Sequence, residues 1–185
     1  QVCDAGSACD PATVSITVGA VNDGPVANDD SFNVSEDGTL TTSVTGNDSD
    51  PDNTTAQLTW SLVSGGTAAA NGTLNFAATG DFTYTPSADF TGSVSFTYQL
   101  CDPGPLCDNA VVTINVNGVN DTPIAGDDAF TMNEDDVLAN AIGGNDSDAE
   151  TPNTLLAWSL VSGGTAATNG ALVLNVDGTF MFTPN

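Results

Sequence analysis

The chain has 185 residues with 24 Asp and Glu and no Lys, Arg or His, which gives a formal net charge of −24. A surface of one sign repels nucleic acid and anionic membranes, so both are poor partners and we predict no nucleic-acid binding. The same surface attracts divalent cations. Without His, Lys or Arg there is no ordinary general base near neutral pH and no cation to stabilise an oxyanion, so we predict that the chain is not an enzyme. No stretch is long enough to span a membrane.

The sequence repeats itself without a gap. Residues 60–69 recur unchanged as residues 158–167, 98 positions later, and one frame with this shift covers the whole chain. A repeat of this regularity predicts tandem copies of one module. It favours a role that depends on length or on many copies over one that depends on a single catalytic pocket.

Short runs of alternating apolar and polar residues, separated by Asn-Gly, Gly-Gly and Gly-Asp turns, predict β-strands along the whole chain. No segment has the apolar period of an amphipathic helix. In chain order, the predicted strands are residues 13–18, 31–35, 40–45, 58–62, 74–76, 82–84, 94–100 and 110–116. The last seven fill one period, which predicts an all-β chain of tandem immunoglobulin-like β-sandwich modules with about seven strands each.

The repeat divides the chain into three parts. Residues 1–22 correspond to the last hairpin and strand of a preceding module, residues 23–119 to a complete module, and residues 120–185 to an incomplete module without its last two strands. Two explanations remain open. Either the chain is a segment of a longer repetitive polypeptide, or residues 1–22 of one subunit donate a strand to the last module of the next subunit in a filament.

The four cysteines form two local pairs with five residues between the partners, Cys3 with Cys9 and Cys101 with Cys107. Pro and Gly between the second pair favour a tight reversal, which suits a disulfide across the mouth of a hairpin. A metal site is disfavoured because the chain has no His and the spacing is not that of a zinc site. Disulfides predict an oxidising, extracellular location.

Acidic residues gather where the modules meet. Each junction has the pattern Val-Asn-Asp-X-Pro, followed by an Asp-Asp pair and then by a Glu-Asp pair. Ca²⁺ prefers about six to eight oxygen ligands from carboxylates, Asn side chains and carbonyls. We therefore predict that the junctions bind calcium, and that an ion bridging two modules stiffens the hinge between them.

A second acidic cluster follows the second strand of each module. Residues 47–53 read Asn-Asp-Ser-Asp-Pro-Asp-Asn, and their copy at 145–150 reads Asn-Asp-Ser-Asp-Ala-Glu. Asp at every second position resembles the start of a calcium loop, but the EF-hand pattern is incomplete. A solvated acidic turn that caps backbone amides is the alternative. The ligands predicted under the calcium hypothesis are Asp48, Asp50, Asp52, Asp146 and Asp148.

The order of these motifs resembles that of bacterial cadherin-like tandem repeats, the group that includes VCBS-type repeats. The resemblance spans the whole chain and rests on Val-Asn-Asp-X-Pro, on Glu-Asp-Gly at 36–38, on Gly-Asn-Asp-Ser-Asp at 46–50, on Gly-Asp-Phe-Thr-Tyr-Thr-Pro at 80–86 and on Ala-Val-Val-Thr-Ile-Asn-Val at 110–116. It implies cadherin-like sandwiches of large secreted or surface-anchored proteins, often adhesins, with Ca²⁺ between modules. The junction ligands that it implies are Asn22, Asp23, Asp29, Asp30, Glu36 and Asp37, with the second copies Asn120, Asp121, Asp127, Asp128, Glu134 and Asp135.

We predict an extracellular structural protein, the calcium-stiffened stalk or filament shaft of a bacterial surface adhesin or appendage. Its partners are then neighbouring repeats or subunits of the same protein. The alternative is a calcium-dependent adhesion module that binds a glycan or a protein on a cell surface. Solvent-facing aromatic residues near residues 48–52 would favour the adhesion module, and ions confined to the junctions would favour the stalk.

Overall fold

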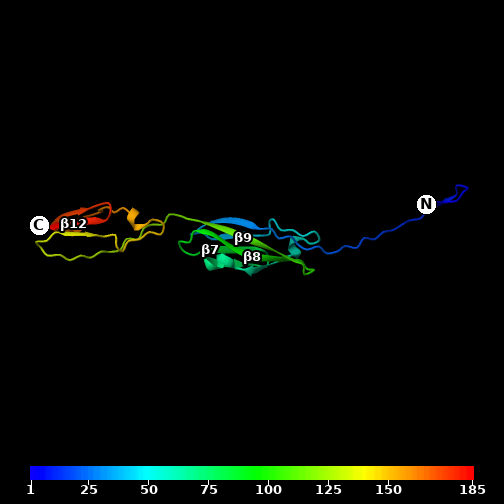
Figure 1. The fold of residues 1–185 in the computed structure, drawn as a ribbon, viewed down its shortest axis with the longest axis horizontal. Coiled ribbons are helices and arrows are strands. Elements are labelled where there is room, and N and C mark those ends of the chain that lie inside the picture. Colours follow the sequence, from blue (N-terminus) through cyan, green and yellow to red (C-terminus); the bar gives the residue numbers. More distant parts are fainter. The chain divides into compact units, whose positions relative to one another are not determined.

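A computed structural model describes all residues, 1–185, and its first repeat is a two-sheet sandwich (Figure 1). One sheet has four strands in the order β3 (Asp30–Ser35), β9 (Cys107–Asn117), β8 (Gly92–Cys101) and β5 (Thr59–Ser64). The other has three, in the order β4 (Leu40–Ser43), β7 (Asp81–Pro86) and β6 (Gly72–Phe76). All seven strands predicted between residues 31 and 116 are present, and the predicted all-β class is confirmed.

The core of the first repeat comes from the inward positions of β7, β8 and β9. Phe96 packs edge-to-face on Phe76 and Phe82, with ring centroids 5.8 and 5.1 Å apart. Full burial of one such side chain stabilises a fold by about 1.5–3 kcal/mol. The outward positions of β8 hold uncharged polar residues, so alternation separates core from surface along this strand. The largest fully buried side chains are Tyr84, Tyr98, Phe96, Leu100, Ile114, Val44, Val94 and Val112.

The second repeat has a single sheet. Its three strands are β10 (Leu138–Ala141), β12 (Thr179–Pro184) and β11 (Gly170–Leu174), the counterparts of β4, β7 and β6. The counterparts of β3 and β5, residues 128–133 and 157–162, are not strands. In the first repeat β3 pairs with β9 and β5 pairs with β8, and residues 120–185 include no counterpart of β8 or β9. A backbone without a neighbour to bond has no reason to stay extended.

The prediction of a strand at residues 13–18 is wrong. The N-terminal segment forms only the short hairpin of β1 (Val2–Cys3) and β2 (Cys9–Asp10), and residues 13–18 have no strand partner. Their counterpart in β9 is held between β3 and β8. An alternating sequence is therefore not enough to form a strand when no adjacent strand is there to pair with it.

Four short helical turns were not predicted. They are the 3₁₀ turns η1 (Thr55–Gln57) and η2 (Asn153–Leu155) and the one-turn helices α1 (Gly66–Ala70) and α2 (Gly164–Asn169). Each is too short for an apolar period to appear in the sequence. No helix has the length and apolar character needed to cross a membrane.

The chain divides into two compact units that do not follow the repeat boundary. The first comprises Gln1–Asn33, Thr39–Thr85 and Ser93–Asn115, and the second comprises Val34–Gly38, Pro86–Gly92 and Val116–Asn185. The second unit thus includes two short segments of the first repeat, the linker between the repeats (residues 117–124) and the second repeat. The acidic residues that converge at the linker all lie within the second unit.

Candidate metal centre

Three carboxylates of the second compact unit converge. Oxygen atoms of Glu36, Asp121 and Glu150 lie within 4.8 Å of one another, and no other set of three or more acidic side chains in the chain does so. Glu36 follows β3 in the first repeat, Asp121 belongs to the linker, and Glu150 belongs to the acidic loop of the second repeat. The cluster therefore combines three separate sequence motifs.

Backbone contacts fix Glu36 against the linker. Glu36 is only 3% exposed. Its backbone N–H donates to the carbonyl of Asn117 at 2.9 Å, and its Oε1 accepts the N–H of Val119 at 2.6 Å. A buried carboxylate that accepts a single backbone hydrogen bond still has lone pairs to offer to a cation.

The acidic loop of the second repeat carries Glu150 and accepts a hydrogen bond from the backbone of Asp121 in the linker. The N–H of Asp121 donates to Glu150 Oε2 at 2.9 Å. Asp148 Oδ1 in turn accepts the N–H groups of Glu150 and Thr151, at 3.2 and 2.7 Å, and so turns the loop. The backbone bridge between Ile124 and Ser147 keeps the linker beside this loop.

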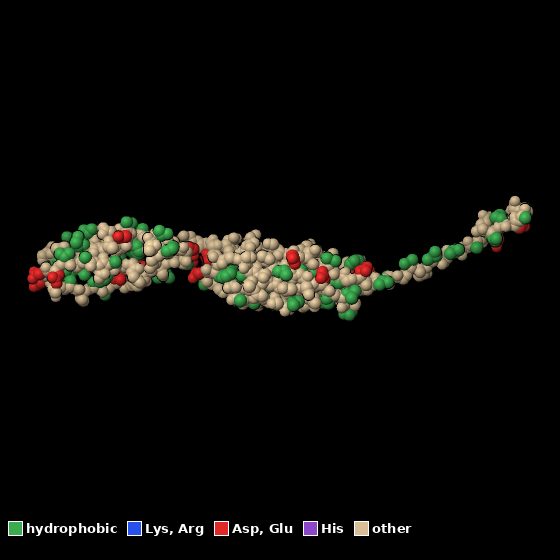
Figure 2. Space-filling model, in the orientation of Figure 1, with side chains coloured by type: hydrophobic (Ala, Val, Ile, Leu, Met, Phe, Trp, Pro, Cys, Tyr) green, Lys and Arg blue, Asp and Glu red, His purple; other side chains and the backbone are tan.

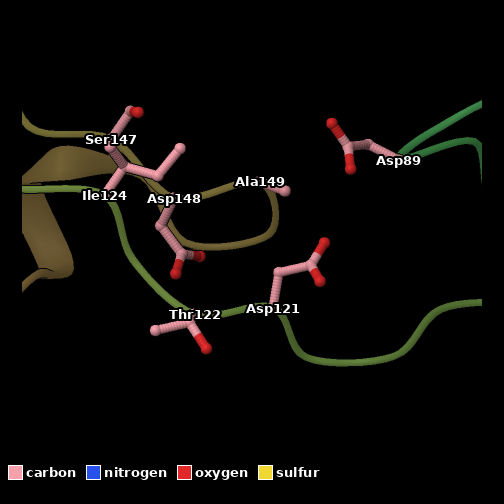
Figure 3. Close-up of a pocket in the computed structure, with 7 residues that line it drawn as sticks. All are labelled: Asp89, Asp121, Thr122, Ile124, Ser147, Asp148 and Ala149. Atoms are coloured by element: carbon pink, nitrogen blue, oxygen red, sulfur yellow. The ribbon is translucent and has the colours of Figure 1, made fainter. Parts of the chain in front are cut away.

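The site has a strongly negative field. Burial raises the pKa of Asp121 above its usual range, and the charges of Asp37, Glu150, Asp89 and Glu36 raise it further. Figure 3 shows the cleft at this point, where the carboxylates of Asp121 and Asp89 face one another. Acidic side chains also stand out on the surface in Figure 2, and the sequence has no Lys, Arg or His to balance them.

The donor set fits a hard divalent cation. Carboxylate oxygens are the ligands that Ca²⁺ prefers, and several of them from different segments allow its flexible coordination. Glu36, Asp121 and Glu150 would hold the ion, which would neutralise the charge that they concentrate.

The linker that enters the first repeat has the same local arrangement. The N–H of Asp23 donates to Asp52 Oδ2 at 2.7 Å, as Asp121 does to Glu150. Asp50 Oδ1 accepts the N–H groups of Asp52 and Asn53 at 2.8 and 2.7 Å. These bonds link Asp23, Asp50 and Asp52 through backbone N–H groups, but their carboxylates do not form a second cluster of three. Glu36 lies with the following linker instead.

The predicted ligands Asp48 and Asp146 are engaged inside their own repeats. Asp48 accepts the indole N–H of Trp60 at 2.8 Å and the hydroxyl of Tyr98 at 2.9 Å. Asp146, which is 8% exposed, accepts the indole N–H of Trp158 at 2.6 Å, and this bond lowers its pKa. Both carboxylates therefore accept the indole N–H of a tryptophan in their own repeat, close to the capping role considered above.

Asp29 and Asp30 also lie within the first repeat. Asp29 Oδ1 accepts the N–H of Val111 at 2.8 Å. Asp30 has a buried Oδ2 atom without a partner, and burial, followed by the charge of Asp48, raises its pKa to about 6. This carboxyl group therefore takes up a proton more readily than a free Asp side chain.

The remaining predicted residues lie outside the cluster. Asn22 donates to Asp102, and Asn120 donates to the adjacent carbonyl of Asp121. Asp37 is exposed, and its charge reaches the cluster through its effect on Asp121. The other exposed residues are Asp127, Asp128, Glu134 and Asp135.

Two residues of the site were missed in the sequence. Glu150 occupies the position of Asp52 in the second repeat, so the repeat frame alone could have identified it. Asp89 lies in the turn after β7 and belongs to no motif that we recognised.

Both predicted disulfides, Cys3–Cys9 and Cys101–Cys107, are present and no cysteine is free.

Fold and site together define a tandem of cadherin-like and immunoglobulin-like β-sandwich domains. The model of the bacterial cadherin-like domain family matches residues 22–118, and that of the bacterial Ig domain family matches residues 120–185. The chain belongs to the bacterial cadherin-like domain family. Both are families of non-catalytic structural or adhesion domains. The search of curated proteins gave no match.

Solved structures of animal cadherins have the same fold. Domains EC3–6 of protocadherin gammaB7 match with a TM-score of 0.55 and 17% identity over 94% of this chain and 46% of theirs. Mouse cadherin-23 EC22–24 matches with a TM-score of 0.54 and 19% identity, over 84% of this chain and 52% of its own. Drosophila N-cadherin EC1–4 matches with a TM-score of 0.54 and 15% identity, over 85% of this chain and 39% of its own. The chain thus spans about half or less of each matched structure.

Proposed function

We propose that this chain is part of an extracellular stalk or filament shaft whose linkers are stiffened by calcium. The observation that carries the proposal is the convergence of Glu36, Asp121 and Glu150 from the turn after β3 of the first repeat, the linker and the acidic loop of the second repeat. A cation at this point would join three segments that are otherwise held together by hydrogen bonds. Its partners are then neighbouring repeats or subunits of the same protein.

The proposed organisation follows the repeat. Residues 1–22 carry the hairpin and strand sequence of a repeat, residues 23–119 form one module, and residues 120–185 begin another. Support comes from the family matches to residues 22–118 and 120–185 and from the two equivalent disulfide hairpins. The disulfides and the domain families also support a location outside the cell, at the surface of a bacterium.

The alternative of a glycan- or protein-binding adhesion module has less support. Its expected signal is an exposed aromatic residue near residues 48–52. The aromatic residues at that loop, Trp60 and Tyr98, are 3% and 0% exposed and bond to Asp48. They therefore belong to the core and leave no aromatic platform for a sugar.

Thermal unfolding in excess Ca²⁺ and in EDTA tests the proposal. A ligand that binds only the folded state at about 100 times its Kd adds about 2.7 kcal/mol of stability, so we expect a clear rise in Tm. Glu36→Gln should abolish most of this rise. Glu134→Gln, the same change at the equivalent position of the second repeat, lies outside the cluster and should leave it unchanged.

Solution scattering supplies the mechanical half of the test, since calcium should narrow the range of conformations of the wild-type chain and not of Glu36→Gln. An equal Tm with and without calcium would refute the metal centre. An equal loss of the calcium effect in Glu36→Gln and Glu134→Gln would place the ion elsewhere.

A further inference from the structure

The disulfide loop between β8 and β9 has a fixed internal structure. Asp102 is 7% exposed. Its N–H donates to the carbonyl of Leu106 at 3.0 Å, and its Oδ1 accepts the N–H of Leu106 at 2.8 Å. One carboxylate oxygen is therefore used inside the loop, and Oδ2 remains available.

The loop between Cys3 and Cys9 has the same internal bonds although it lies in a different environment. Asp4 donates from its N–H to the carbonyl of Ala8 at 2.9 Å, and its Oδ1 accepts the N–H of Ala8 at 2.9 Å. Two copies with one structure indicate that the disulfide and the first Asp after it define this conformation locally. The loop is thus a preformed element that presents one carboxylate oxygen outward.

In the first repeat, that oxygen contacts the linker. Asn22 Nδ2 donates to Asp102 Oδ2 at 2.6 Å. Gly104 lies so close to Asn22 that a Cβ atom there would be 2.8 Å from Nδ2, and a Cβ atom on Gly24 would be 3.3 Å from Cβ of Leu106. These contacts are tight because glycine leaves no side chain between the loop and the linker.

A further bond comes from the residue that follows the disulfide. Asp108 Oδ2 accepts the N–H of Ala27 at 3.0 Å. Linker residues 22–27 are therefore contacted at both ends by the loop and the start of β9. All these residues lie in the first compact unit.

The linker after the first repeat provides a comparison within the same chain. It shares the Val-Asn-Asp-X-Pro motif and the backbone bridge, Ile124 with Ser147 in place of Val26 with Ser49. Its Asn120, however, donates to the adjacent carbonyl of Asp121.

We infer that the Cys101–Cys107 loop is a clamp on the linker at residues 22–27, with Asp102 as the residue that positions Asn22. The disulfide matters because it removes conformational freedom from the loop before the linker binds, so that the linker contacts need not offset the cost of ordering it.

Amide hydrogen exchange in EDTA tests the clamp independently of calcium. In the wild-type chain, the N–H groups of Asp23 and Ala27 should exchange more slowly than that of Asp121. The Cys101→Ser/Cys107→Ser variant should raise exchange at Asp23 and Ala27 by about tenfold, because these amides then open locally. The matched control, Cys3→Ser/Cys9→Ser, removes the equivalent disulfide away from this linker and should leave these rates unchanged.

Two further variants keep the disulfide and so remain informative if its removal unfolds the repeat. Asn22→Ala should accelerate exchange at Asp23, and the control Asn120→Ala should not. Combining Asn22→Ala with Asp102→Ala should accelerate it no more than the stronger single change does, as expected for residues that act through one bond.

Unchanged exchange in both Asn22→Ala and the Cys101→Ser/Cys107→Ser variant would overturn the clamp, whatever calcium does to Tm. Additive effects of Asn22→Ala and Asp102→Ala would overturn the role of Asp102. If calcium does not raise Tm but Asn22→Ala and Cys101→Ser/Cys107→Ser still accelerate exchange, the metal centre is refuted and the clamp is supported.

Discussion

The same ten residues fold differently in the two repeats. In the first repeat, residues 60–69 contribute most of β5 and the helix α1, and Trp60 is 3% exposed. In the second, residues 158–167 contain the start of α2 but no strand, and Trp158 is half-buried. Identical sequences share every local propensity, so the difference comes from the neighbours: β5 pairs with β8, and its counterpart has no such strand beside it.

What both copies share is local. Each tryptophan stacks beneath a glycine with positive φ, Gly80 at +84° or Gly178 at +81°, and donates its indole N–H to a carboxylate. The turns and the indole–carboxylate bond thus form from near neighbours, whereas the strand needs a distant partner. The comparison predicts that equivalent substitutions have unequal costs in the two repeats.

The largest difference should follow from Trp60→Ala and Trp158→Ala. Truncation of a buried Trp leaves a cavity and costs about 3–5 kcal/mol. Trp158 loses less contact, so its truncation should cost about 1 kcal/mol. Urea unfolding followed by circular dichroism measures both, and equal costs would mean that the two environments are alike.

The sequence predicted the first repeat well because its strands are amphipathic and all their partners lie in the same chain. Alternation in residues 94–100 and 110–116 marked β8 and β9, which have inward residues that are almost fully buried. Residues 13–18 have the same alternation and no partner, and no sequence rule separates the two cases. Strand formation is therefore predictable here only where the pairing is known.

The candidate site was predictable in its chemistry and less so in its grouping. The motifs predicted Glu36 and Asp121 as candidate ligands, which the structure places in one acidic cluster, and the repeat frame would have added Glu150. The sequence order placed Glu36 with Asp23, because both stand at the start of one repeat. In the structure Glu36 contacts the linker 83 residues further along the chain, a distance that local spacing does not reveal.

Substitution of the carboxylate beneath each tryptophan should have the second-largest effect. Asp48→Asn places an amide where the indole of Trp60 and the hydroxyl of Tyr98 both need an acceptor. The amide keeps one acceptor oxygen and puts an NH₂ donor in place of the other, so one of the two donors loses its acceptor, which costs about 2–3 kcal/mol in a buried site. Asp146→Asn should cost about 1 kcal/mol, because Trp158 can bond to water.

This pair also separates a structural role from a ligand role. If Asp48 acts only as an acceptor, the loss of stability in Asp48→Asn is the same in EDTA and in calcium. A loss seen only in calcium would make Asp48 a metal ligand after all.

A smaller and pH-dependent effect should come from Asp30→Asn. The folded-state pKa of Asp30 is raised from 3.8 to about 6, so its contribution to stability is present at low pH and is lost as the pH rises through about 6. At pH 7.5 the uncharged Asn should therefore stabilise the first repeat, by about 1 kcal/mol once solvent screening of this partly exposed group is taken into account.

The gain from Asp30→Asn should shrink as the pH falls from about 6 to about 4, where Asp30 itself becomes neutral. Urea titrations in EDTA at several pH values measure it. Asp128→Asn, the equivalent change at an exposed position, should show no such dependence, and a gain that is constant with pH would assign the effect to something other than the proton.

The smallest difference concerns one hydroxyl group. Tyr84 is 0% exposed and donates to the carbonyl of Asn71 at 3.0 Å, just after α1. The second repeat has Phe182 at this position, and the equivalent carbonyl of Asn169 accepts the N–H of Asn185. Tyr84→Phe should cost about 1 kcal/mol, the net value of a buried hydrogen bond. Phe182→Tyr should change stability by less than about 0.5 kcal/mol, because that side chain is partly exposed and a new hydroxyl group can remain in water. Urea unfolding resolves the first effect, and a gain from Phe182→Tyr as large as the loss from Tyr84→Phe would show that the two sites are equally closed to solvent.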